Sequence, residues 1–181
     1  MEALREQIDQ AVALGDTPAT VDRIKHILSG FIRAGRLVLP ERYYQISSDH
    51  YARRLLFRNR DLGYTAVVMT WGPGQGTAVH DHAGIWCVEV VVDGEMKVTQ
   101  YELLEETNGM CRFLKREPVH ASVGSAGCLI PPFEHHVLAN ARDATSITLH
   151  IYGGEITRCN VYYPRADGSY ERQARALSYD E

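Results

Sequence analysis

The sequence predicts an all-β domain, built as a barrel or a sandwich and covered by an N-terminal helical layer. Apolar residues recur at helical spacing before Pro40. From Tyr51 onward, short β-branched and aromatic runs separated by Gly, Pro, Asn and Asp recur roughly every 8–12 residues, as in sandwiches and barrels. No repeat or linker divides the 181 residues. We therefore expect a single domain, with 1–40 as a helical segment packed on a β-barrel formed by 41–181.

The helical segment has a clear start and stop. Thr17-Pro18 is typical of a hydroxyl N-cap followed by proline at the first helical position. Gly35 suits the C-terminal cap, and Pro40 closes the segment. Between them, one apolar stripe recurs every three to four residues: Val21, Ile24, Leu28, Phe31 and Ile32.

Six runs are the expected strands: Thr65–Trp71, Trp86–Val92, Met96–Leu103, Gly127–Ile130, Thr145–Tyr152 and Cys159–Pro164. Asp93-Gly94 lies between two of these runs, and this dipeptide predicts a tight hairpin.

Composition narrows the class of function. Lys and Arg total 19 against 23 Asp and Glu, a net charge of −4, which argues against a nucleic-acid partner. No apolar run is long enough to span a bilayer, and the first residues lack a signal-peptide pattern, so we expect a cytoplasmic protein without a membrane partner. The four cysteines form no CxxC pair, which disfavours a disulfide scaffold or a cysteine-ligated zinc site.

Histidines in the apolar middle of the chain are the candidate metal ligands. His80 and His82 alternate on an expected strand, so both rings should point to one face while Asp81 faces the other way. Two neutral imidazoles on an inward face are suited to a metal ion. A third ligand should come from a neighbouring strand, and His136 is the candidate.

The spacing resembles that of the cupin superfamily. Its first motif, G-x5-H-x-H-x3,4-E-x6-G, is filled by Gly74, His80, His82, Cys87 and Gly94, with Cys in place of the Glu. Its second motif, P-x-G-x2-H-x3-N, is filled by Pro131, His136 and Asn140, with Phe133 in place of the Gly. The resemblance implies a double-stranded β-helix, or jelly-roll, barrel. His135 remains an alternative to His136, because its distance from Tyr152 suits the family interval.

Loss of the carboxylate ligand at Cys87 leaves three neutral histidines and a more positive metal, which suits a thiolate ligand. This combination resembles the cysteine dioxygenase, or thiol dioxygenase, family over about residues 40–165. Thr148-Leu149-His150-Ile151-Tyr152 is similar to its S-x-H-x-Y strand. There the three polar residues form a relay, in which His150 would orient the Tyr152 hydroxyl. The N-terminal helices and the tail from Arg165 add little to the resemblance.

Two further family features concern Cys87 and an arginine. Some members join the Cys at this position to the Tyr at the position of Tyr152 by a thioether. The alternative for Cys87 is a buried cysteine with only a packing role.

Tyr51-Ala52-Arg53-Arg54-Leu55 resembles the Y-x-R-x-L strand whose Arg binds the substrate carboxylate. The motif selects Arg53, while counting back from Trp71 selects Arg54 unless the Asn59–Gly63 turn holds one extra residue. We prefer Arg53, because turns absorb insertions more easily than strands.

The resemblance implies a mononuclear Fe(II) enzyme that oxidises a small carboxylated thiol with O2 to its sulfinic acid. L-Cysteine is the expected substrate, because members that act on 3-mercaptopropionate carry Gln and Gly where this chain has Arg53 and Cys87. Other thiols, such as mercaptosuccinate, are alternatives. So are another metal-dependent cupin enzyme and a non-catalytic cupin that binds a small molecule. Expected partners are the thiol and O2, with the protein a monomer or a small homo-oligomer.

Overall fold

Two helices form the first layer of the molecule. The computed structural model describes residues 1–181, with helices α1 (Glu2–Val12) and α2 (Thr17–Arg33) followed by the short 3₁₀ helix η1 (Glu41–Tyr44). The N-cap of α2 is Asp16, whose carboxylate accepts a hydrogen bond from the backbone N–H of Ala19 at 2.9 Å. The predicted Thr17 cap was therefore one residue late, because the carboxylate satisfies the free backbone donor and Thr17 is already helical. Neither helix has the length and apolar character that crossing a bilayer would require.

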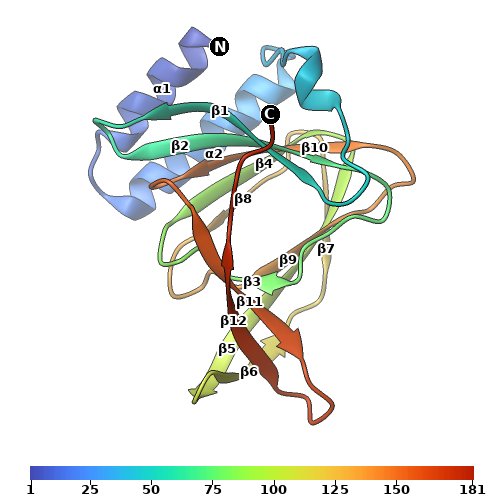
Figure 1. Ribbon diagram of the computed structural model, residues 1–181. Coiled ribbons are helices and arrows are strands. Elements are labelled where there is room, and N and C mark those ends of the chain that lie inside the picture. Colours follow the sequence, from blue (N-terminus) through green and yellow to red (C-terminus); the bar gives the residue numbers. More distant parts are fainter.

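The strands form two facing sheets (Figure 1). The five-stranded sheet has the order β1 (Ala52–Asn59), β2 (Tyr64–Trp71), β10 (Ser146–Tyr152), β4 (Cys87–Asp93) and β8 (Ala126–Leu129). The seven-stranded sheet has the order β6 (Met110–Lys115), β12 (Tyr170–Ala176), β11 (Arg158–Pro164), β3 (Val79–His80), β9 (His136–Asn140), β5 (Glu95–Thr107) and β7 (Val119–Ser122). The predicted all-β barrel with a helical layer is confirmed.

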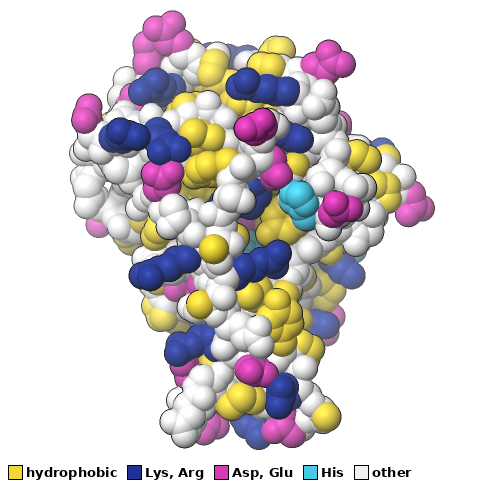
Figure 2. All heavy atoms as spheres, viewed as in Figure 1, with side chains coloured by type: hydrophobic (Ala, Val, Ile, Leu, Met, Phe, Trp, Pro, Cys, Tyr) yellow, Lys and Arg dark blue, Asp and Glu magenta, His cyan; other side chains and the backbone are white.

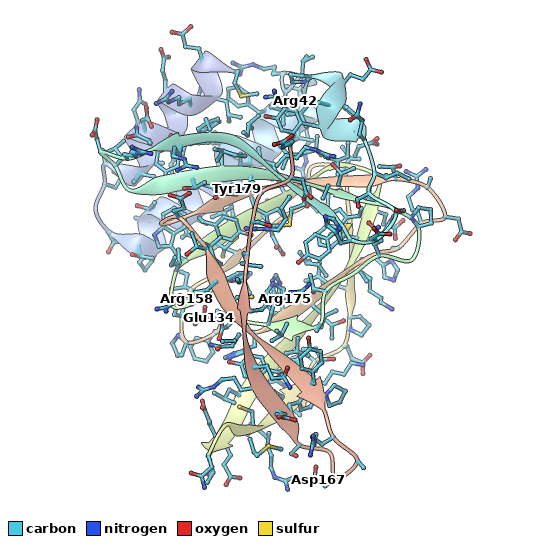
Figure 3. All side chains as sticks on the ribbon, in the orientation of Figure 1. Arg42, Glu134, Arg158, Asp167, Arg175 and Tyr179 are labelled. Carbon is cyan, nitrogen blue, oxygen red and sulfur yellow. The ribbon has the colours of Figure 1, made fainter.

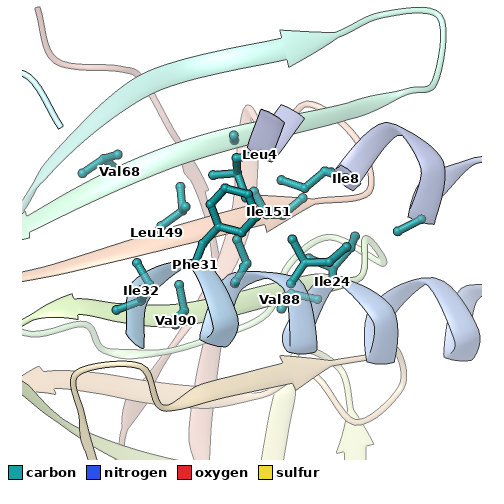
Figure 4. Close-up of a cluster of buried hydrophobic side chains, with 14 of the residues drawn as sticks. Leu4, Ile8, Ile24, Phe31, Ile32, Val68, Val88, Val90, Leu149 and Ile151 are labelled. Carbon is teal, nitrogen blue, oxygen red and sulfur yellow. The ribbon is translucent and has the colours of Figure 1, made fainter. Parts of the chain in front are cut away.

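The helices cover the outer face of the five-stranded sheet (Figures 1 and 4). Ile24 and Phe31 of α2 pack in one buried cluster with Val88, Leu149 and Ile151 of the sheet. The alternate residues of the same strands point between the two sheets and form a second cluster, which includes Val67, Met69, Trp71, Cys87 and Tyr152. Because side chains alternate along a strand, the sheet separates a mainly apolar layer under the helices from the barrel interior.

The predicted Asp93-Gly94 hairpin is wrong. The two residues carry the chain from β4 in one sheet to β5 in the other, and these strands do not pair. Gly94 adopts φ +80°, and a Cβ there would lie 2.3 Å from Ser146 Oγ, so the corner requires glycine. A two-residue hairpin forms instead at Asn108-Gly109, where both residues have positive φ and Thr107 pairs with Met110.

Candidate metal centre

Three histidines converge between the sheets. His80 ends β3, His82 follows it in a loop, and His136 begins β9 directly opposite His80. Their nearest ring nitrogens all lie within 4.8 Å of one another. The expected strand through His82 is absent, since β3 ends at His80. Instead Glu134 accepts a hydrogen bond from the backbone N–H of His82 at 2.8 Å and fixes the turn that presents its ring.

The three rings are neutral and partly without partners. Burial lowers the pKa of His80, and burial together with the neighbouring rings lowers those of His82 and His136 further. His80 Nδ1 donates to the carbonyl of Ala78 at 3.1 Å, so the lone pair of the ring is on Nε2 and is free to bind a metal. His82 Nδ1 and both nitrogens of His136 are buried without any hydrogen bond. Orphaned imidazole nitrogens around one point fit a transition-metal ion.

The neighbouring His135 lies outside this group. Its Nε2 donates to the Tyr162 hydroxyl at 3.3 Å, which in turn donates to Asp81 at 2.9 Å. Asp81 also accepts from the backbone and side-chain amides of Asn160. Burial alone would raise the pKa of Asp81, but these hydrogen bonds outweigh it and hold the pKa below its usual value. The Asp81 network therefore ties β3 to β11 beside the histidines.

A hydrogen-bonded row crosses the interior face of β10. Trp71 Nε1 donates to Thr148 Oγ1 at 2.9 Å, and Thr148 Oγ1 lies 2.8 Å from His150 Nε2. His150 Nδ1 lies 3.9 Å from Cys87 Sγ. Burial, with help from Arg53 and His80, lowers the pKa of His150 to about 3, so this ring is neutral.

Tyr152 lies beside this row rather than at its end. Its ring stacks on His150 with centroids 5.9 Å apart, and His150 faces Thr148 and Cys87 instead of the tyrosine hydroxyl that it was expected to orient. Rings two residues apart on a strand point the same way, which favours stacking. Tyr152 also lies 5.8 Å from the His82 ring and pairs directly with Cys87 across β10 and β4. Burial raises the pKa values of both side chains.

The structure separates Arg53 from Arg54. Arg53 points into the interior beside Tyr51, whose ring stacks on Trp71 at 4.4 Å. Arg54 points to the opposite face, where it donates to Thr70 and to the carbonyl of Glu181. The extra residue that brings Arg53 opposite Met69 is a β-bulge at Leu56 inside β1, not an insertion in the Asn59–Gly63 turn as expected. Because a bulge adds one residue to the strand, every residue before it points to the opposite face of the sheet from the one that simple counting gives.

The end of the chain covers Arg53. We call Leu177–Asp180 the C-terminal strap. Arg53 Nη1 donates to the carbonyl of Ser178 at 2.8 Å, and Tyr179 lies over the guanidinium at 5.4 Å. Figure 3 labels Tyr179 of this segment. Asp180 accepts from the Arg53 backbone N–H and donates to its carbonyl, both at 2.7 Å. The tail from Arg165, which adds little to the sequence resemblance, therefore contributes directly to this site.

The histidines stand between two cavities. The smaller, about 60 Å³, is lined by Tyr51, Arg53, His80, His82, Tyr152 and the β11–β12 ribbon. The larger, about 340 Å³, lies between β4 and β5 and reaches His136. Glu89 lines the larger cavity, with its carboxyl oxygens 3.8 Å from His136 Nδ1 and 3.6 Å from His150 Nδ1. Burial raises the pKa of Glu89 to about 8.

The sequence matches a family of known proteins. The family model described as Cysteine dioxygenase type I matches residues 18–165. The chain belongs to the cysteine dioxygenase type I family. The match begins within α2, so the family unit includes most of the helical layer as well as the barrel.

Curated members of the cysteine dioxygenase family are distant relatives. Cysteine dioxygenase type 1 from Homo sapiens and from Bos taurus are each 20% identical in an alignment of 131 residues that covers 68% of this chain. The chain spans 60% of the length of these relatives. Among solved structures, a protein from Thermus thermophilus is 19% identical with a TM-score of 0.48, covering 64% of this chain and 94% of its own. A Klebsiella pneumoniae protein with a double-stranded β-helix domain is 20% identical with a TM-score of 0.49, covering 66% and 85%.

Proposed function

We propose that this chain is an Fe(II) thiol dioxygenase that converts a small carboxylated thiol and O2 into a sulfinic acid. The observation that carries the proposal is a neutral three-histidine centre without a carboxylate ligand, next to the buried guanidinium of Arg53. The family match supports this reaction type. In the reaction RSH + O2 → RSO2H, both oxygen atoms end on sulfur, so no external reductant is needed.

His80, His82 and His136 would hold the iron. When bound, the metal supplies open coordination positions for the thiolate and for O2. Three neutral ligands leave its positive charge undiminished, which favours the thiolate over the thiol. The residues around it then have to bind the rest of the substrate and to keep water out.

Arg53 binds the substrate carboxylate. Only 6% of Arg53 is exposed, and its Nη2 is buried without a partner, so it can donate to an incoming anion. The strap holds the guanidinium in place through Ser178 and Tyr179. An immobilised planar fork is suited to a carboxylate, and it sets the distance between that carboxylate and the sulfur.

Tyr152 acts as a hydrogen-bond donor beside His82. Its raised pKa keeps the hydroxyl protonated, so it can donate to an oxygen or sulfur atom of the substrate. The Trp71–Thr148–His150 row fixes the wall next to it. Met69, Trp71 and Tyr152 pack together and form an apolar wall on the five-stranded sheet beside the centre.

The test is O2 uptake by iron-loaded protein with a panel of small thiols that includes L-cysteine, the substrate expected from Arg53 and Cys87. We expect thiol-dependent uptake, with both atoms of labelled O2 recovered in the sulfinate. His82→Ala should abolish uptake and His135→Ala should retain it, because His82 faces the centre and His135 does not. A zinc-loaded sample controls for non-enzymatic thiol oxidation. The absence of thiol-dependent uptake across the panel would refute the proposal.

A further inference from the structure

Glu89 is a buried acidic side chain that the proposed reaction leaves without a role. Acidic side chains project from the surface on the face shown in Figure 2, where water solvates them. Glu89 instead lies inside, on β4, with only 12% of its side chain exposed. Its Oε2 is buried without a hydrogen bond, and no Lys or Arg pairs with it. A carboxyl group in this state costs free energy, so its presence calls for a compensating role.

The two carboxyl oxygens of Glu89 face two different imidazole rings. Oε1 lies 3.8 Å from His136 Nδ1, and Oε2 lies 3.6 Å from His150 Nδ1. Both distances exceed a hydrogen bond by less than about 1 Å. A small rotation of the side chain closes this gap, since the larger cavity leaves room beside it. His136 Nδ1 has no hydrogen-bond partner, and His150 Nδ1 has only the long contact with Cys87 Sγ at 3.9 Å.

The hydrogen-bonded row on β10 directs a proton of His150 toward Glu89. Trp71 Nε1 can only donate, so Thr148 Oγ1 accepts from it. The hydroxyl proton of Thr148 then has one acceptor within hydrogen-bond distance, His150 Nε2. A neutral imidazole that accepts at Nε2 has its proton on Nδ1, the atom that faces Glu89. The row therefore ends in a donor that points to the carboxyl group.

His136 presents a second donor to the same carboxyl group. Its Nδ1 is beside Glu89, which leaves Nε2 as the nitrogen that can bind a metal. A neutral ring that binds a metal through Nε2 has its proton on Nδ1. Metal-bound histidines usually donate this second proton to a carboxylate, a carbonyl or water, which fixes the ring and strengthens its bond to the metal.

We propose that Glu89 is a positioning residue of the metal centre, whose carboxyl group accepts the Nδ1 protons of His136 and His150 together. It thereby joins one metal ligand to the Trp71–Thr148–His150 row. This inference rests on the three-histidine centre of the proposed function and is independent of which thiol is oxidised. The unpaired carboxyl group destabilises the metal-free protein and strengthens metal binding, whereas a side chain with only a packing role would stabilise both forms.

The first test measures Zn²⁺ affinity by calorimetry, without turnover. Glu89→Leu should raise the dissociation constant for Zn²⁺ about 10–100-fold, because His136 loses its acceptor. Glu89→Gln keeps a carbonyl oxygen for one of the two rings and should lose less. Glu117→Leu is the matched control, because this exposed glutamate lines the same cavity and contacts neither ring. Unchanged affinity in Glu89→Leu would overturn the inference.

Thermal unfolding separates positioning from packing. The metal-free Tm of Glu89→Leu should equal or exceed that of the wild type, because an unpaired buried carboxyl group is removed. The rise in Tm on adding Zn²⁺ should be smaller in this variant. A lower metal-free Tm with an unchanged rise would assign Glu89 a packing role and overturn the inference.

NMR of zinc-loaded protein with ¹⁵N-labelled histidine observes the two protons directly. The Nδ1 protons of His136 and His150 should be protected from exchange with water in the wild type and lose this protection in Glu89→Leu. Equal protection in both proteins would contradict the inference. If iron-loaded protein shows no thiol-dependent O2 uptake, the proposed function fails, and these zinc measurements still decide the role of Glu89.

Discussion

At the scale of single residues, the adjacent side chains of His135 and His136 lie in two different environments. Both rings are buried, but His136 faces His80 and His82, whereas His135 packs against Phe113 and Tyr162. The backbone at the start of β9 sends successive side chains to opposite faces. One ring therefore joins the candidate metal centre and the other joins the Asp81 network.

His136→Ala should raise the dissociation constant for Fe(II) at least about 100-fold, because it removes one of three ligands. His135→Ala should keep the metal and lose only some stability, since its ring donates to Tyr162 outside the centre. Anaerobic iron titration of both variants, with metal content measured after desalting, checks this. Equal iron retention by the two variants would refute the ligand assignment.

Cys87 and Tyr152 are cross-strand partners on the interior face, so the thiol and the ring that a thioether would join lie on the same side of the sheet. After turnover, we expect the intact mass of a fraction of the protein to fall by about two hydrogens, as joining a thiol to a ring requires. Cys87→Ser should abolish the mass change. Cys128→Ser is the matched control, because Cys128 pairs with Val88 on the other face of β4. An unchanged mass would leave Cys87 with a packing role.

The site residues could be predicted where a motif contains them and not where tertiary structure brings them in. His80, His82 and His136 follow from motif spacing, and the structure brings them together. Arg53 was left open against Arg54 because the choice depends on one bulged residue, Leu56, that no turn signal marks. Glu89 belongs to no motif, and it becomes a site candidate only once the fold places β4 beside His136.

At the scale of elements, α2 stabilises the sheet that carries much of the site. Ile24 is fully buried against the sheet (Figure 4), so Ile24→Ala should lower the free energy of unfolding by about 2–5 kcal/mol. Leu14→Ala, at a side chain that is 56% exposed, is the matched apolar control and should change it by less than about 0.5 kcal/mol. Denaturant titration gives both values. Similar losses in the two variants would contradict this account of the helical layer.

Two dipeptide signals show why elements are predicted better than their pairings. Asp93-Gly94 and Asn108-Gly109 carry the same local preference for positive φ. Only the second joins paired strands, because β4 and β5 belong to different sheets. All six expected strands are present. The two-residue strand β3 is defined by its pairing with β9 and β11 rather than by a local sequence pattern. Local sequence determines the turn, and the fold decides which strands it connects.

At the scale of the whole molecule, the candidate centre joins distant parts of the chain. His80 and His136 come from different strands of one sheet, while His82 lies close to Tyr152 and His136 lies close to Glu89 of the other sheet. Metal binding should therefore stabilise the entire fold. At a free Fe(II) concentration about 100 times Kd, the gain is about 2.7 kcal/mol, which raises Tm by roughly 5–10 °C. Anaerobic thermal unfolding with and without Fe(II) measures the shift.

The control for this prediction is the same measurement on His136→Ala, where no shift is expected. A chelator should return the wild-type Tm to its metal-free value. An equal shift in the variant would mean that iron stabilises the protein at some other place.

The two faces of β10 carry two separable properties of the molecule. Ile147, Leu149 and Ile151 pack with the helices, whereas Thr148, His150 and Tyr152 border the centre. Substitutions that lower the amount of folded protein and substitutions that lower turnover should therefore fall at alternating positions of this strand. Saturation mutagenesis across 147–152 would give two fitness profiles with the same period of two residues, one shifted by a single position from the other.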